Sequence, residues 1–123
     1  MFIDGVDFEW CFRARHKGFK CFGVTEAAMK HPVGDDGFHI RVANQTARIP
    51  VHGPVRRYYI MRNRLHLYKR AYVPLPWKVR DLRRFAVECC YFALVAKPRA
   101  QHIAAMAKGI RDGVMNVYGP IPT

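Results

Sequence analysis

Acidic residues are few in this chain of 123 residues, which has nine Asp and Glu against 21 Lys and Arg. Long apolar stretches are also missing. The longest, 85–96, holds twelve residues and is interrupted by Glu88, whereas a helix that spans a bilayer takes roughly 20. The sequence shows no internal repeat and no low-complexity tract. These absences argue against a transmembrane helix and against a repeat protein.

Apolar and aromatic side chains are plentiful, at 50% and 13% of the residues. This composition predicts a packed core rather than a disordered chain. The length suffices for one small domain or part of one. It is too short for an enzyme of two substrate sites with its own nucleotide pocket.

The four cysteines include no Cys-Xaa-Xaa-Cys pair, and no secretory signal precedes them; they are Cys11, Cys21, Cys89 and Cys90. This usage predicts reduced thiols in the cytoplasm, packed mainly as small apolar side chains. We therefore expect neither disulfides nor a zinc site.

The formal net charge of +12 is unevenly distributed. Residues 1–36 contain five Lys and Arg against six Asp and Glu, whereas the remainder contains sixteen against three. Such a basic surplus suits nucleic acid, an anionic membrane surface or a phosphate-bearing substrate, and charge alone does not choose among them.

Hydrophobic periodicity and chain breakers predict several helices and a few short strands. The opening residues read as the end of a strand, and residues 33–51 read as a loop at the rim of a site. An apolar stripe at helical spacing follows Pro54 and comprises Tyr58, Met61, Leu65, Tyr68 and Tyr72. The expected strands are Phe19–Val24 and Ala28–His31, and the other expected helices are Asp7–Lys17, with Asp7 as N-cap and Gly18 as the stop, Trp77–Lys97 and Arg99–Asp112.

Three carboxylates, Asp4, Asp7 and Glu9, stand within six positions at the expected strand-to-helix junction. Such junctions lie at the ligand crevice of α/β folds. A carboxylate there can accept a proton from a hydroxyl nucleophile. Spacing alone favours a plainer interpretation, in which these residues cap the helix and interact with its dipole.

Residues 2–14 resemble the acidic motif of the family 2 glycosyltransferases, in particular a bacterial rhamnosyltransferase-like branch with the pattern Phe-Ile-Asp-Xaa-Val-Asp-Xaa-Glu-Trp-Cys-Xaa-Arg-Ala. The resemblance implies an α/β fold, namely the C-terminal portion of a GT-A (Rossmann-like) enzyme, locally rich in helices. It implies that Asp7 is the general base of an inverting transfer. It also implies that Glu9 and Trp10 bind the acceptor.

The segment Met29 to Asp35 is similar to the family's Met-Xaa-His-Xaa-Xaa-Gly-Asp pattern and has His31 at the histidine position. The resemblance implies that this histidine ligates a divalent cation, Mg²⁺ or Mn²⁺, or contacts the diphosphate; a structural histidine is the alternative. The Asp-Xaa-Asp motif and the nucleotide-binding strands of the family are absent, and Asp35 and Asp36 do not replace them.

Residues 56–63 resemble the Arg-Xaa-Tyr-Tyr-Xaa-Xaa-Arg-Asn helix of the same branch. Arg62 and Asn63 are therefore expected to bind the diphosphate or the phosphate of a lipid-linked acceptor. A solvated basic face beside a Tyr/Leu core is the alternative for most of these arginines.

The resemblance divides the chain into residues 1–52, the acceptor side of a catalytic domain, and 53–123, a basic helical extension. It implies a dTDP- or UDP-sugar donor, with rhamnose as the suggested sugar, and a glycan or lipid-linked acceptor at the inner face of the membrane. The isolated chain should be inactive, because the nucleotide-binding half is missing. The alternative is a non-catalytic module that binds anionic membranes. Nucleic acid is not expected as a partner, because most tyrosines line an apolar helix face.

Overall fold

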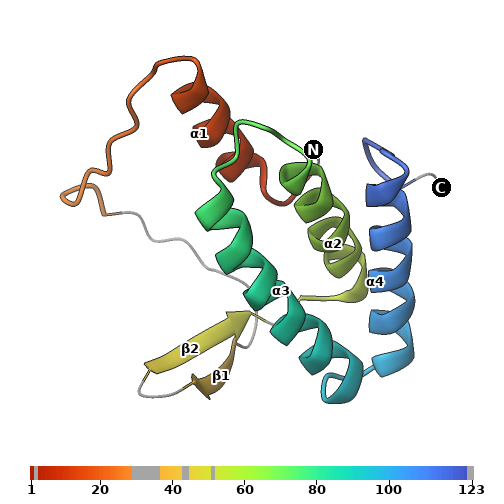
Figure 1. Cartoon of the computed structure of the whole chain (residues 1–123). Helices are drawn as coiled ribbons and strands as arrows, with labels where there is room; N and C mark the ends of the chain where they lie inside the picture. The colour runs from red at the N-terminus through yellow and green to blue at the C-terminus, as the bar shows by residue number, and fades with distance from the viewer. Residues whose placement is uncertain (2, 29–36, 43–44, 51, 122–123) are drawn as a thin grey trace. The chain divides into compact units, whose positions relative to one another are not determined.

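The computed structural model describes residues 1, 3–28, 37–42, 45–50 and 52–121. Contacts divide the chain into two compact units, Met1–Cys21 together with Pro54–Thr123, and Phe22–Gly53. The first unit holds four helices and the second a hairpin (Figure 1): α1 Val6–His16, β1 Gly37–Val42, β2 Gln45–Pro50, α2 Pro54–Tyr68, α3 Leu75–Leu94 and α4 Arg99–Val114. Helix α1 therefore belongs with the later helices, whereas we expected a boundary at residue 52. The domain division of a longer protein stays a prediction.

The hairpin lies where the sequence predicted a loop. Strands β1 and β2 pair antiparallel, with Gly37 opposite Pro50 and Val42 opposite Gln45. The predicted strand at Phe19–Val24 is wrong, because these residues form no strand. Their β-prone composition finds no partner strand in the part of the chain that the structure describes, and an unpaired strand is not stable. Of the other predicted strand, Ala28–His31, only Ala28 is among the described residues. The GT-A fold stays a prediction.

Helix α1 begins two residues earlier than an Asp7 cap would allow. The N-cap is Gly5, in the left-handed region with φ of 72°, and no side chain caps the helix. The capping role predicted for Asp7 is therefore wrong, and Asp7 lies in the first turn, where a negative charge is favoured by the helix dipole. The stop at Gly18 is confirmed: its φ is 89°, and the Phe19 amide donates to the Ala14 carbonyl at 3.1 Å.

Helix α2 is the centre of the first unit, since most of its side chains are buried. It packs closely against α4 because two glycines of α4 carry no side chain. A Cβ at Gly109 would lie 2.5 Å from the Tyr58 carbonyl oxygen, and one at Gly113 would lie 2.9 Å from the Leu65 Cβ. Polar contacts join the same two helices: Tyr58 donates to Asp112 at 2.8 Å. The sequence predicted both helices and not this close approach.

Helix α3 begins at Leu75, with Pro74 as N-cap and Pro76 in the first turn, where a missing amide donor costs nothing. Its buried face includes Glu88 and Phe92. No helix in the described ranges is long and apolar enough to cross a bilayer.

We predict that Gly109→Ala destabilises the first unit. Alanine favours a helix by about 1 kcal/mol over glycine, but the added methyl would force α2 and α4 apart, and overpacking costs roughly 1–3 kcal/mol. We expect a net loss of up to about 2 kcal/mol in the free energy of unfolding, measured by urea denaturation. Gly23→Ala is the control, because no atom lies within 4 Å of a Cβ there. Equal effects of the two substitutions would contradict the close approach.

Candidate acceptor site on helix α1

Asp7 is exposed in the first turn of α1. No hydrogen bond or ion pair joins its carboxylate to another of the described residues. The side chain therefore has no structural partner within the described chain, and its oxygens are open to an incoming hydroxyl group. The role of Asp7 as a general base stays a prediction.

Trp10 lies one turn along α1 from Asp7, on the same side of the helix. Its side chain is 59% exposed. Phe8 and Phe12 contact α3 instead: their rings lie 5.7 Å and 5.1 Å from that of Trp77, although Phe8 remains 56% exposed. An exposed carboxylate and an exposed indole thus share one surface of α1, a combination that suits the hydroxyl and apolar faces of a sugar.

The Glu9 carboxylate is bound by two side chains of the chain itself. Its Oε1 accepts hydrogen bonds from the Tyr72 hydroxyl at 2.6 Å and from Arg13 Nε at 3.0 Å. Burial would raise the pKa of Glu9, but the hydrogen bonds from Tyr72 and Arg13 outweigh it, and the pKa lies below its ordinary value. Glu9 therefore ties α1 to the segment after α2. Acceptor binding by this carboxylate stays a prediction.

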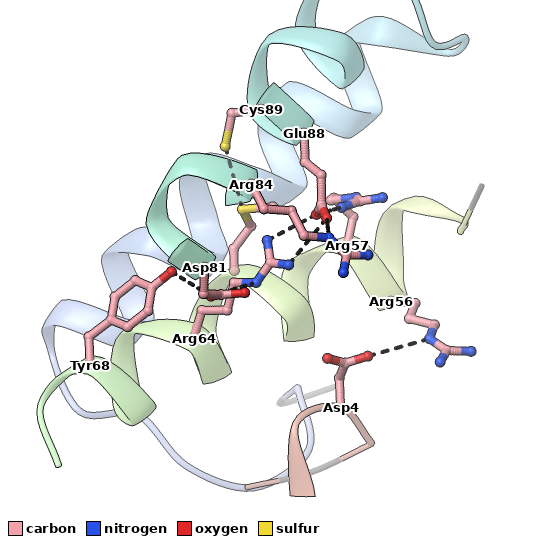
Figure 2. Close-up of polar contacts among 10 residues, drawn as sticks. Asp4, Arg56, Arg57, Arg64, Tyr68, Asp81, Arg84, Glu88 and Cys89 are labelled. Carbon is pink, nitrogen blue, oxygen red and sulfur yellow. Dashed lines mark hydrogen bonds and ion pairs between the residues drawn. The ribbon is translucent and has the colours of Figure 1, made fainter. Parts of the chain in front are cut away.

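Asn63 and Asp4 join α2 to the loop before α1. The Asn63 side-chain amide donates to the Asp4 carbonyl at 2.7 Å. The Asp4 carboxylate lies 3.8 Å from Arg56 Nε (Figure 2). Asn63 is almost fully buried. Its amide thus positions the start of α1.

The Arg62 guanidinium is buried, with an exposed fraction of 0%. It lies over the rings of Tyr58 and Tyr59, 5.2 Å and 4.9 Å from their centroids, and Nη1 donates to the Tyr58 hydroxyl at 3.3 Å. A phosphate cannot reach this guanidinium in the conformation described. Phosphate binding by Arg62 and Asn63 remains a prediction that this geometry does not support.

The predicted metal ligand, His31, lies outside the described residues. Among those described, no group of three His, Cys, Asp or Glu side chains could hold a metal ion. The described side chains thus provide no set of ligands that fits Mg²⁺ or Mn²⁺.

Sequence reasoning missed the main electrostatic feature, a buried cluster around Glu88 of α3 (Figure 2). Arg64 binds both carboxylate oxygens of Glu88, at 2.9 Å and 3.2 Å. Arg57 donates to the same carboxylate at 3.1 Å, and Arg84 at 2.9 Å. The Glu88 side chain is only 5% exposed. One acidic residue of α3 therefore pairs with two arginines of α2, and the expected solvated basic face is wrong for Arg57.

A second acid completes this cluster. Asp81 accepts a hydrogen bond from the Tyr68 hydroxyl at 2.6 Å and lies 3.4 Å from Arg64 Nε. Burial, together with that hydrogen bond to Asp81, raises the pKa of Tyr68. The available sequence signal was Glu88 itself, the single charge in the apolar run 85–96, because a lone buried carboxylate requires a cationic partner.

We predict that Glu88→Gln costs about 3–5 kcal/mol of unfolding free energy, because it leaves buried arginines without their counter-charge. Burial alone would raise the pKa of Glu88, but Arg64, Arg57 and Arg84 hold it below the ordinary 4.5. The stability from this pairing is present above about pH 4.5 and is lost as the pH falls through the lower pKa of the folded state.

Thermal unfolding measured between pH 7 and pH 2 checks this sign. The Glu88→Gln variant should lose less stability on acidification than the parent chain. An identical acid slope in the two proteins would contradict the assignment. Glu26→Gln is the control, because Glu26 is exposed and bonds only the neighbouring Thr25 among the described residues.

The chain is similar to a dTDP-rhamnosyl transferase, RfbF, of Shigella flexneri, with 30% identity over 119 residues. The match covers 97% of this chain and 39% of the relative, so the chain spans about two fifths of that protein's length. No protein-family model and no solved structure matches the chain. The similarity agrees with the resemblance in the acidic motif and supports glycosyl transfer as the general class of reaction.

Proposed function

We propose that this chain is the acceptor side of an inverting GT-A glycosyltransferase, which transfers a sugar from a nucleotide donor to a glycan or lipid-linked acceptor. The similarity to a rhamnosyl transferase along 97% of the chain carries the proposal. The free, exposed carboxylate of Asp7 supports it, because that residue is the expected base of the acidic motif.

In this mechanism Asp7 accepts the proton of the acceptor hydroxyl as its oxygen attacks the anomeric carbon of the donor. The bond from that carbon to the nucleoside diphosphate breaks on the opposite face, and the configuration at the carbon inverts. General-base assistance of this kind contributes typically 10²–10⁴-fold in rate. Trp10 packs against the acceptor sugar beside Asp7.

Glu9 is a positioning residue in this account. Its hydrogen bond from Tyr72, which lies outside α1, fixes the rotation of the helix and with it the direction in which Asp7 points, whereas its bond from Arg13 lies within α1. Positions one helical turn apart lie on the same surface, so a rotation of α1 would move Asp7 and Trp10 together.

The donor is proposed to be a dTDP- or UDP-sugar, with rhamnose favoured by the relative's name. Its diphosphate requires electrostatic stabilisation as it leaves. We assign that role to the part of the relative's length that the match does not cover. By the resemblance, His31 would be one ligand of a divalent cation, which would supply positive charge for the diphosphate. A transferase reduced to this chain should therefore be inactive or nearly so.

A chimera tests this function. The matching two fifths of the Shigella flexneri relative is replaced by this chain, and sugar transfer from dTDP-rhamnose to the relative's own acceptor is measured. We predict that the chimera is active and that Asp7→Asn lowers kcat at least about 100-fold, because the base is lost. Its thermal unfolding should change little, because Asp7 has no hydrogen-bond or ion-pair partner among the described residues and only its small interaction with the helix dipole is lost.

Glu26→Gln in the chimera is the matched control, since it removes an exposed carboxylate outside α1. It should retain nearly full activity. A folded chimera without activity, or an Asp7→Asn chimera as active as its parent, would refute the proposal.

A further inference from the structure

The outward side of α3 is apolar. Five large aliphatic side chains of this helix are between 44% and 70% exposed, and they define what we call the outer face: Leu75, Val79, Leu82, Val87 and Leu94. Leu75, Val79 and Leu82 follow one another at about one turn and form a stripe, and Val87 and Leu94 lie roughly 100° around the helix from it. Such a stripe on a helix of 20 residues is a candidate interaction surface.

The charges on this side of α3 are all positive. Arg80 and Arg83 are exposed beside the apolar stripe. The two acids of α3, Asp81 and Glu88, turn the other way and are occupied by the buried cluster with Arg64. The fold thus removes the negative charges of α3 from its surface and leaves its basic ones exposed.

The surface continues past the end of α3. Leu94 and Val95 are 67% and 52% exposed, and the exposed cations Lys97 and Arg99 follow at the start of α4. At 1.5 Å per residue α3 is about 30 Å long. It is too polar to cross a bilayer and long enough to lie along one.

We propose that the outer face of α3 docks on an anionic lipid bilayer. Helices that combine an apolar stripe with Lys and Arg and lie in the interface plane bind such surfaces, since the apolar side chains enter the acyl boundary and the cations meet head-group phosphates. A second copy of this chain fits less well, because a two-fold contact would place Arg80 and Arg83 against the same cations. This surface is separate from the Asp7 site and does not depend on the proposed transfer reaction.

Vesicle sedimentation of the full chain tests the proposal. The chain should bind vesicles of mixed phosphatidylglycerol and phosphatidylcholine, bind phosphatidylcholine vesicles much more weakly, and be released by salt. The double variant Arg80→Gln/Arg83→Gln should bind about 30-fold more weakly, from the loss of two charges near the surface. Val79→Gln/Leu82→Gln should weaken binding at least about tenfold at unchanged net charge.

Matched control variants distinguish binding by the outer face from a general effect of positive charge or of exposed apolar side chains. Arg15→Gln/Lys20→Gln removes two exposed cations outside α3, and Val55→Gln/Val114→Gln replaces two exposed aliphatic residues outside α3. Both control variants should bind almost as the parent chain does. Circular dichroism verifies that every variant is folded.

Equal binding to the two kinds of vesicle, or equal losses in test and control variants, would overturn the proposal. A third contrary result is concentration-dependent self-association that Val79→Gln/Leu82→Gln abolishes while vesicle binding is absent. That outcome would assign the outer face to a second copy.

Discussion

Helix α2 buries polar side chains that would ordinarily face water, and contacts to Arg57, Arg64 and Asn63 from α3 and from the loop before α1 help to arrange the first unit. Arg57 and Arg64 meet Glu88 of α3, and Asn63 meets the Asp4 carbonyl before α1. An unpaired buried charge costs several kcal/mol. These contacts therefore fix which neighbours α2 accepts, and they position α1 and its carboxylates as a result.

The three acids that stand together in the sequence have different surroundings in the fold. The Asp4 carboxylate lies 3.8 Å from Arg56 Nε, and the Glu9 carboxylate is bound by Arg13 and Tyr72. Asp7, two residues from Glu9, stays exposed. When neighbouring residues make the structural contacts, the carboxylate oxygens of a catalytic residue remain open to substrate. The glycosyltransferase proposal rests on this division of roles together with the similarity to a rhamnosyl transferase.

Much of the helical structure followed from the sequence, because a 3.6-residue apolar period and Pro or Gly at the ends act locally. The α2 helix after Gly53, the stop of α1 at Gly18 and the start of α4 at Arg99 were found in this way. Strands depend on a distant partner, so the run after Gly18 was misassigned and the hairpin was missed. The burial of Arg62 could not be predicted from the sequence either, because a basic residue beside tyrosines is compatible with a surface as well as with a core.

The central claim is that Asp7 alone among these acids is available for chemistry. Urea unfolding of the chain with Asp7→Asn and, separately, Glu9→Gln tests it most directly. Glu9→Gln should cost about 1 kcal/mol through its lost bonds to Arg13 and Tyr72, whereas Asp7→Asn should stay within about 0.5 kcal/mol of the parent chain. A loss for Asp7→Asn as large as that for Glu9→Gln would show that Asp7 has a structural role, and would contradict the account.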